Sequence, residues 1–161
     1  MRAACRLFAG ILPFLLPHYG FAQTPKALDE RLVVELVAQE PDIVTPTGLA
    51  VDERGRIWAI ENHTHQRKPD YQGPPSDRIK IYDDFDGDGR ARRVRLFAEG
   101  FKNGMGLALG KTGEVYFATR SDIFVLRDTN GDDFVDEKKV IVRLDTPGDY
   151  PHNGLSGFAF D

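Results

Sequence analysis

The chain repeats one pattern of residues, and this repeat limits the folds open to it more than any other feature. Each unit has an apolar segment, a short turn that contains glycine, and a second apolar segment. The units occupy residues 47–60, 104–118 and 154–161, and the third holds only the first segment. Leu49, Leu107 and Phe158, which take the same place in the pattern, are separated by 58 and 51 residues. Units of about 40–50 residues built from short strands are typical of β-propeller blades.

A second hairpin completes each of the first two units. Apolar and β-branched residues predict its strands at residues 79–82, 94–97, 123–126 and 140–144. Four strands per unit predict an all-β fold, a partial β-propeller. Its parts are blade one at residues 47–99, blade two at 104–146 and the first strand of blade three at 154–161. A β-sandwich made of the same hairpins is the alternative, but the pattern recurs whole and in order, which favours the propeller.

A propeller ring needs about four to eight blades to close, and two blades with one extra strand do not reach that number. We therefore expect this chain to be a fragment of a longer propeller and to be inactive alone. Residues 23–46 form a leader, in which residues 32–37 are expected to be a strand that completes the last blade of the closed ring. Exposed strand edges would promote aggregation, so a monomer with a cooperative melt would contradict the fragment prediction.

The first 22 residues have the three-part pattern of a secretory signal peptide. Arg2 and Arg6 precede an apolar run at residues 7–16, and small residues lead to a cleavage site after Ala22. We expect cleavage there and export to the periplasm or the cell exterior. A membrane anchor or a buried helix is the alternative, but the run is shorter than the roughly 20 apolar residues that a membrane span needs.

The mature chain would contain no cysteine, because Cys5 is the only one and lies in the signal peptide. It would therefore have no disulfide, no thiolate metal site and no cysteine nucleophile. Loss of two arginines would change the net charge from −4 to −6. Nucleic acid requires a basic surface, so we expect a small-molecule partner rather than nucleic acid, and no membrane span in the mature chain.

Two acidic loops lie at matching places in the two units and resemble the first half of an EF-hand calcium loop. Alternate side chains of a tight loop converge on one point, where hard oxygens replace the water around a calcium ion. The expected ligands of a structural calcium are Asp84, Asp86 and Asp88 in the first loop and Asp128, Asn130, Asp132 and Asp136 in the second. Four positions depart from the motif, namely Arg95 and Lys139 in place of glutamate, Asp133 in place of glycine and Arg92 in place of an acid at position 9 of the first loop. An Asp- and Gly-rich turn without metal is the alternative.

Polar residues gather where loops leave the inner strands, and in a propeller these loops converge on the central channel. They are Glu61, Asn62, His63 and His65 in blade one, Arg120 in blade two, and His152 and Asn153 before the third unit. An imidazole exchanges a proton near neutral pH, so a histidine here can take the proton of an alcohol as hydride leaves.

Each of these residues also has a simpler interpretation. For His63 and His65 we favour a solvated loop, and two histidines without a third ligand are a weak zinc signal. His152 can be a turn residue after a proline. Arg120 can bind an anion or form a salt bridge at the rim.

The stretch from Pro41 to Asp161 resembles the start of the glucose/sorbosone dehydrogenase propellers. It is most similar to a planctomycete-type bacterial group classed as membrane-bound dehydrogenases. The segments that carry the resemblance are residues 47–52, 58–65, 77–79, 84–89, 105–108, 118–120 and 148–155. The resemblance implies a six-bladed propeller related to the soluble quinoprotein sugar dehydrogenases, which use pyrroloquinoline quinone (PQQ) and calcium.

The resemblance also implies a function and a set of site residues. The longer protein would be an exported dehydrogenase that oxidises a sugar or another alcohol. His152 stands where the family has its general base, and the site would be lined by Glu61, Asn62, His63, Arg120 and Asn153. The electron acceptor would be a partner such as a cytochrome domain beyond Asp161, and the chain itself has no C-x-x-C-H haem attachment motif.

Two other functions remain open at this point. One is a metal-dependent propeller lactonase, in which Glu61 would bind the catalytic ion. The other is a non-catalytic propeller that binds carbohydrate or protein at the cell surface.

Overall fold

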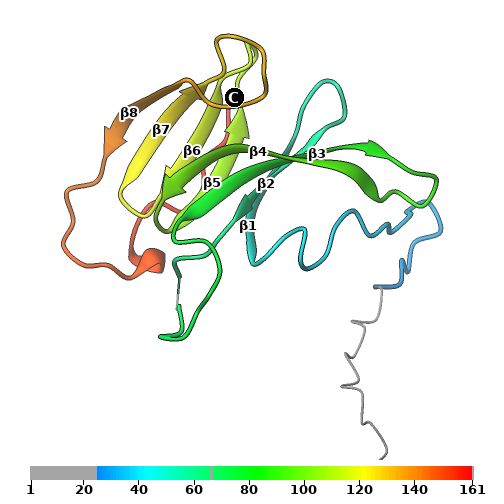
Figure 1. Cartoon of the computed structure of the whole chain (residues 1–161), viewed down its shortest axis with the longest axis horizontal. Coiled ribbons are helices and arrows are strands. Elements are labelled where there is room, and N and C mark those ends of the chain that lie inside the picture. The colour runs from blue at the N-terminus through cyan, green and yellow to red at the C-terminus, as the bar shows by residue number, and fades with distance from the viewer. Residues whose placement is uncertain (1–24, 66, 161) are drawn as a thin grey trace, which may run out of the picture. The chain divides into compact units, whose positions relative to one another are not determined.

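The computed structural model describes residues 25–65 and 67–160, and these residues form two four-stranded antiparallel sheets (Figure 1). Sheet one contains, in order, β1 (Pro46–Val51), β2 (Ile57–Glu61), β3 (Asp77–Phe85) and β4 (Ala91–Phe101). Sheet two contains β5 (Gly104–Leu109), β6 (Val115–Thr119), β7 (Asp122–Arg127) and β8 (Glu137–Arg143). One 3₁₀ turn, η1 (Pro151–Asn153), follows. Each sheet is a meander of sequential hairpins, which is the form of a blade, so the predicted partial propeller is confirmed.

The chain divides into two units, residues 1–34 and 35–161, and both sheets lie in the second. The predicted signal peptide, residues 1–22, lies outside the described residues. Within the described residues, no helix is long and apolar enough to cross a membrane.

The hydrophobic core lies between the two sheets, because alternate residues of each strand face the other sheet. Phe101 of sheet one packs against Phe117 and Phe124 of sheet two, with ring centroids 4.6 and 5.4 Å apart. Each fully buried large apolar side chain contributes about 1.5–3 kcal/mol to stability. The buried cluster is made of Trp58, Ile60, Ile79, Ile81, Phe97, Ala98 and Phe101 from sheet one and Leu107, Val115, Phe117, Leu126 and Val135 from sheet two and its loops.

The two sheets have the same backbone features at equivalent positions of the sequence repeat. Both inner strands, β1 and β5, shift register at the same place, between Pro46 and Gly48 and between Gly104 and Gly106. A residue with positive φ precedes each strand, and its carbonyl accepts the amide that follows the second strand of the same sheet. The two units are therefore copies of one structure as well as of one pattern.

The start of the third unit contacts the second unit in the same way as the second unit contacts the first. A Cβ built on Gly48 would lie 3.4 Å from the backbone of Leu107, and one built on Gly106 would lie 3.3 Å from that of Gly157. Gly157 and Gly106 are equivalent in the repeat. The start of unit three thus lies beside β5 as β5 lies beside β1.

Two predicted strands are absent from the described residues. Residues 32–37 and residues 154–160 follow the expected sequence pattern, but neither forms a strand. A strand exists only with a hydrogen-bonded neighbour, and the partners expected for these two segments belong to blades that the two sheets do not supply. The role of residues 32–37 in closing a ring stays a prediction, as do the domain limits.

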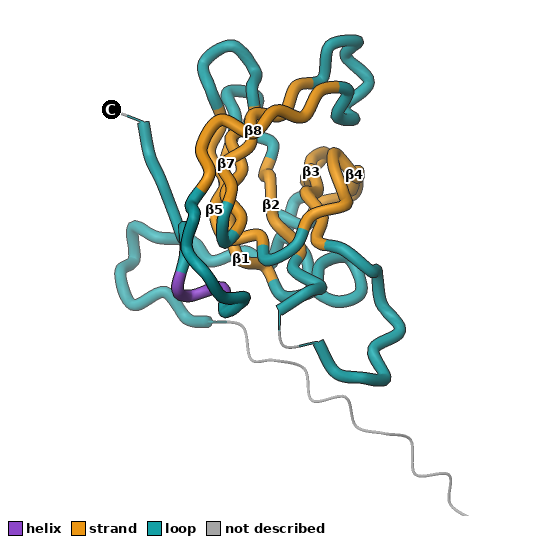
Figure 2. Tube along the Cα trace, turned by 90° about the vertical axis from the view of Figure 1, so that its left-hand side faces the viewer, coloured by secondary structure: helices purple, strands orange, loops and turns teal. Residues whose placement is uncertain are grey.

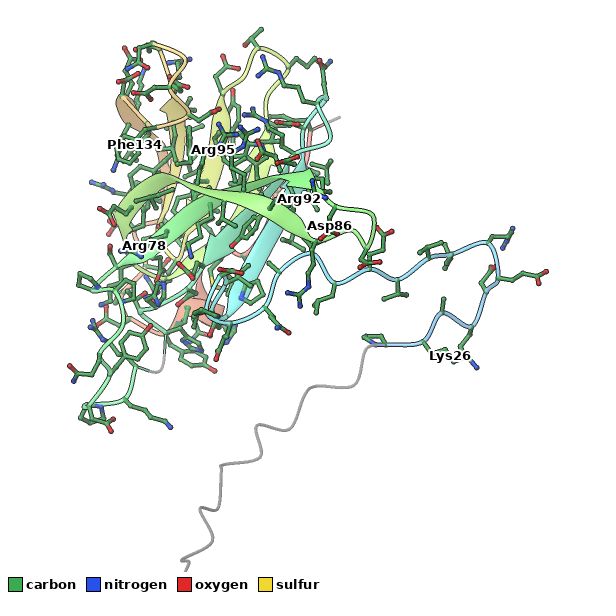
Figure 3. The ribbon with its side chains drawn as sticks, turned by 45° about the vertical axis from the view of Figure 1, so that its right-hand side comes forward. Lys26, Arg78, Asp86, Arg92, Arg95 and Phe134 are labelled. Atoms are coloured by element: carbon green, nitrogen blue, oxygen red, sulfur yellow. The ribbon has the colours of Figure 1, made fainter. Side chains whose placement is uncertain are left out.

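An ionic contact joins the two sheets at the end that carries the β1–β2 turn. The carboxylate of Asp133, from the loop before β8, accepts hydrogen bonds from Arg56 (2.7 Å) and from Arg95, which is labelled in Figure 3. Asp133 has φ = 64°, a conformation that aspartate tolerates better than most residues. The residue that departs from the calcium motif therefore links blade one to blade two.

Candidate functional site

The loop after β2 and the start of β5 meet at one end of the sheets, which we call the loop end. Asp77, whose side chain is fully buried, holds these segments together. One carboxylate oxygen accepts the amides of His63 (2.7 Å) and Thr64 (2.9 Å). The other accepts the Thr64 hydroxyl (3.0 Å) and the amide of Gly104 (2.7 Å). A buried carboxylate is stable only when hydrogen bonds compensate its lost hydration, and these four bonds fix the loop after β2 to the start of β5.

Asn62 connects the same two segments. Its side-chain nitrogen donates to the Gly104 carbonyl (3.2 Å), and its side-chain oxygen accepts the amides of Thr64 (3.1 Å) and His65 (3.0 Å). The side chain is 4% exposed. Asn62 was predicted to line a site, and the structure gives it the role of holding the loop.

Arg120 is the equivalent of Asn62 in blade two, and it holds the segment before the third unit. Its guanidinium donates to the carbonyls of Thr146 (3.0 Å), Pro147 (3.0 Å) and Tyr150 (3.4 Å) and to the Ser121 hydroxyl (3.0 Å). Its own carbonyl accepts the amide of Leu155 (2.8 Å). Neither of the two predicted roles, an anion site or a salt bridge at the rim, matches these partners. Arg120 is a clamp on the loop that carries His152.

The clamped loop brings His152 to His65. Their imidazole rings lie edge to face with centroids 5.2 Å apart, and Tyr150 lies 5.1 Å from His152 and 6.3 Å from His65. His152 and Asn153 are exposed in η1, and His65 is half-buried. η1 is drawn in purple in Figure 2. The imidazoles of His65 and His152, which are 87 positions apart in the sequence, thus lie side by side at the loop end.

His63 and Glu61 lie beneath this position. Their side chains are 1% and 2% exposed, so the interpretation of His63 as part of a solvated loop was wrong. The ring is held because its Nδ1 is hydrogen-bonded to the Tyr71 hydroxyl and its Nε2 lies 2.9 Å from Oε2 of Glu61. Both side chains are therefore buried in this structure, and their place in the lining of a substrate site stays a prediction.

Glu61 is an ionised carboxylate. Its Oε1 accepts the Lys80 ammonium (2.9 Å) and the Val44 amide (3.1 Å). Burial by itself raises the pKa of Glu61, but the hydrogen bond from Lys80, followed by the contact with His63, outweighs burial and leaves the pKa below its usual value. Burial and the Glu61 charge raise the pKa of neighbouring Tyr82, so its hydroxyl stays protonated and donates to the Asp42 carbonyl (3.0 Å).

A cavity of about 260 Å³ lies at the loop end of sheet two. Its volume is below the roughly 300–1,000 Å³ of sites for drug-sized ligands, so it suits only a small molecule. Two of its lining residues belong to the clamped region: Arg120 is the clamp, and Asp149 lies in the loop that it holds. The lining residues are Gly100, Phe101, Lys102, Asn103, Thr119, Arg120, Ser121, Asp122, Phe124 and Asp149.

The first acidic loop has the geometry of a hairpin turn (Figure 3 labels Asp86 in this loop and Arg92 in β4 just after it). Asp86 accepts the amides of Asp88 (3.0 Å) and Arg90 (2.9 Å), and Gly89 has φ = 79°. The β1–β2 turn is built in the same way on Asp52, although that turn has no calcium motif. The arrangement of the loop therefore needs no ion.

The second acidic loop is also closed by its own hydrogen bonds. Asp128 accepts three loop amides, and Asp136 accepts the Thr129 amide (2.7 Å) and hydroxyl (2.9 Å) and the Asn130 side chain (3.1 Å). Across residues 25–65 and 67–160, no three His, Cys, Asp or Glu side chains are placed to hold a metal ion. Calcium in either loop stays a prediction.

Sequence reasoning missed three parts of this site. Asp77 begins one of the segments that carry the family resemblance, but no motif assigned it a role, and its position two residues after a proline was the other available signal. The pairing of His65 with His152 depends on the clamp at Arg120, which no local pattern reveals. Tyr71 lies in a polar loop and gives no signal before the fold is known.

The comparisons with known proteins agree with this architecture. A protein-family model described as "Domain of unknown function (DUF7133)" matches residues 26–159. The holo form of the PQQ domain of a pyranose dehydrogenase from Coprinopsis cinerea is similar in structure, with a TM-score of 0.50 and 10% sequence identity. No curated protein matches the sequence.

The structural match covers 68% of this chain and 24% of the solved one, so the chain spans about a quarter of the length of that structure. At this identity the likeness shows a shared propeller-type fold and nothing further. The more specific resemblance to glucose/sorbosone dehydrogenases stays a prediction.

Proposed function

The chain belongs to the DUF7133 family, and we propose that it supplies the proton-accepting loop of an exported propeller dehydrogenase that oxidises a sugar or another small alcohol. The single observation that supports this proposal is the exposed imidazole of His152, held beside His65 by a loop that Arg120 clamps. A general base must be both accessible to substrate and fixed in position. His152 meets both conditions, because it is exposed while Arg120 binds the carbonyls of Thr146, Pro147 and Tyr150 in its loop.

The chemistry assigned to this chain is limited to the proton. A hydroxyl group that reaches the loop end donates its proton to the free nitrogen of His152 as the alcohol carbon is oxidised. His65 and Tyr150 border the ring and restrict its orientation. The small cavity beside the loop is lined by two phenylalanines and by amide, hydroxyl and charged groups, and the polar groups are of the kind that bind sugar hydroxyls.

The described residues do not by themselves form a site for PQQ. The quinone carries carboxylates, which require free cationic groups. Of the two cationic residues that line the cavity, Arg120 is engaged by loop carbonyls, which leaves Lys102 alone to bind a carboxylate. The calcium that accompanies PQQ has no acidic cluster among the described residues. We therefore derive no step through the quinone, and PQQ, calcium and an electron-accepting partner belong to the proposal for the longer protein.

No contact in the structure favours the metal-dependent lactonase. Glu61, which would bind its ion, is buried against Lys80 and His63 instead of facing a cavity. A non-catalytic sugar-binding propeller would use the same loop end, and the experiment below distinguishes it from a dehydrogenase.

The test uses the protein that contains this chain, supplied with PQQ, calcium, a panel of sugars and alcohols, and an electron-accepting dye. We expect His152→Ala to lower kcat by about 100-fold or more, the usual contribution of a general base. Lys111→Ala, in the turn at the opposite end of the strands, should leave kcat unchanged.

Full turnover by the His152→Ala variant would contradict the proposal. Sugar binding without dye reduction would indicate a binding protein, and lactone hydrolysis without dye would indicate the lactonase.

A further inference from the structure

Tyr71, His63 and Glu61 form a line of three side chains that the proposed dehydrogenase does not use. The Tyr71 hydroxyl is hydrogen-bonded to Nδ1 of His63. On the other side of the ring, Nε2 lies 2.9 Å from Oε2 of Glu61. The line runs from the half-buried Tyr71 in the loop before β3 to a fully buried carboxylate at the end of β2.

The contacts determine which proton each group holds. An ionised Glu61 can only accept, so we assign the hydrogen of the neutral ring to Nε2, which faces Oε2 of Glu61, and Nδ1 then accepts the Tyr71 hydroxyl. The Nε2–H is not well aligned with the carboxylate, but neither Nε2 nor Oε2 has a hydrogen-bond partner elsewhere in the described residues. Nε2–H and Oε2 therefore attract each other electrostatically without forming a well-aligned hydrogen bond.

Glu61 is fixed in the orientation that this requires. Lys80 and the Val44 amide bind its other oxygen, so Oε2 stays directed at His63. An imidazole that gains a proton from Tyr71 becomes an imidazolium ion beside a buried carboxylate, and the buried setting strengthens that attraction. The order hydroxyl, imidazole, carboxylate is the arrangement by which proteins activate a hydroxyl nucleophile.

Two neighbours of Tyr71 support this arrangement. The guanidinium of Arg67 lies 5.1 Å from the centre of the Tyr71 ring, a cation–π contact that helps to hold the ring in place. At Gly73, a Cβ would lie 2.1 Å from the Tyr71 hydroxyl oxygen. A side chain at position 73 would therefore displace the Tyr71 hydroxyl from its place beside His63.

We propose that Tyr71 is an activated nucleophile, with His63 as its base and Glu61 as the group that orients and stabilises His63. Its ligand class is a small molecule with an electrophilic acyl or sulfonyl centre. In the reaction, the Tyr71 oxygen forms a bond to that centre, the leaving group departs with the electron pair of its own bond, and the phenol proton passes to Nδ1 of His63. This inference does not depend on the proposed dehydrogenase function.

The test treats the chain with an aryl sulfonyl fluoride at neutral pH and follows labelling of each tyrosine by mass spectrometry. The Tyr71 oxygen would form the S–O bond as fluoride leaves. Tyr150 is the internal standard, because it is 52% exposed and exposure alone would make it the faster of the two. We expect Tyr71 to react about 100-fold faster, as for a hydroxyl with a positioned base.

His63→Gln removes the base, and Gly73→Ala displaces the hydroxyl from it without changing the buried residues. Either variant should lower labelling of Tyr71 to the rate of Tyr150, while labelling of Tyr150 is unchanged. Labelling of Tyr71 no faster than Tyr150 in the native chain would overturn the proposal. So would rapid labelling that persists in Gly73→Ala, a result that remains informative if the His63 variant does not fold.

Discussion

Replacement of Arg120 by lysine should release the loop that carries His152. The guanidinium binds three carbonyls of residues 146–150 and the Ser121 hydroxyl. A lysine ammonium is a compact donor on a flexible stem and cannot reproduce this planar set of contacts. Because the substitution keeps the positive charge, any change in loop opening comes from the loss of the guanidinium's hydrogen-bond geometry.

The magnitude follows from the number of hydrogen bonds that are lost. The residues that supply the three carbonyls are exposed, so water replaces the guanidinium when it is removed. Each such bond then contributes a net stabilisation of about 0.5–1.5 kcal/mol. Loss of two of the three weakens the closed loop by about 1–3 kcal/mol, which corresponds to a roughly 5- to 150-fold increase in its open population.

Amide hydrogen exchange measures this opening directly. The amide of Leu155 donates to the Arg120 carbonyl (2.8 Å) and that of Asn153 to the Tyr150 carbonyl (3.1 Å). Both should exchange faster in Arg120→Lys by the factor above, whereas amides within β2 and β3 should not change. Unchanged exchange at Leu155 and Asn153 would refute the assignment of Arg120 as a clamp.

Other consequences of the structure can be measured by urea unfolding. Asp133→Asn should lower the free energy of unfolding by about 1–2 kcal/mol, because it removes the charge between the two arginines of blade one. Asp132→Asn is the control. Equal losses of stability in the two variants would contradict the link between the blades. Asp77→Asn should cost about 2–4 kcal/mol, since an amide nitrogen cannot accept the hydrogen bonds now made by one carboxylate oxygen, and a loss below 1 kcal/mol would contradict its role. The lowered pKa of Glu61 means that its contribution is complete above the usual pKa of a glutamate and is lost as the pH falls through the folded value. Glu61→Gln should therefore reduce the slope of stability against pH in the acid range, and an unchanged slope would exclude this contribution.

The sequence was sufficient to predict the two blades, because their signals are local. Alternating apolar residues and glycine-containing turns mark each strand, and the repeat marks where one blade ends and the next begins. The equivalent register shifts at Gly48 and Gly106 show how closely the structure follows the repeat. The two missing strands, at residues 32–37 and 154–160, have the same local signal but depend on non-local partners.

The site was predicted less well, because its contacts join segments that are distant in the sequence. A buried His63 and a half-buried His65 cannot be distinguished by composition, since two residues in one loop share the same surroundings along the chain. The role of Arg120 depends on carbonyls 26 to 30 positions away. Asp133 departs from the calcium motif for a reason that only the facing arginines explain.

Everything proposed for the loop end depends on His65 and His152 lying together. The most direct measurement is the nuclear Overhauser effect between their imidazole carbon-bound protons in the isotopically labelled chain. Rings with centroids 5.2 Å apart should give a clear cross-peak, which should weaken in Arg120→Lys as the loop opens. Absence of the cross-peak in the native chain, with both imidazoles resolved, would contradict the arrangement on which His152 is assigned as the base.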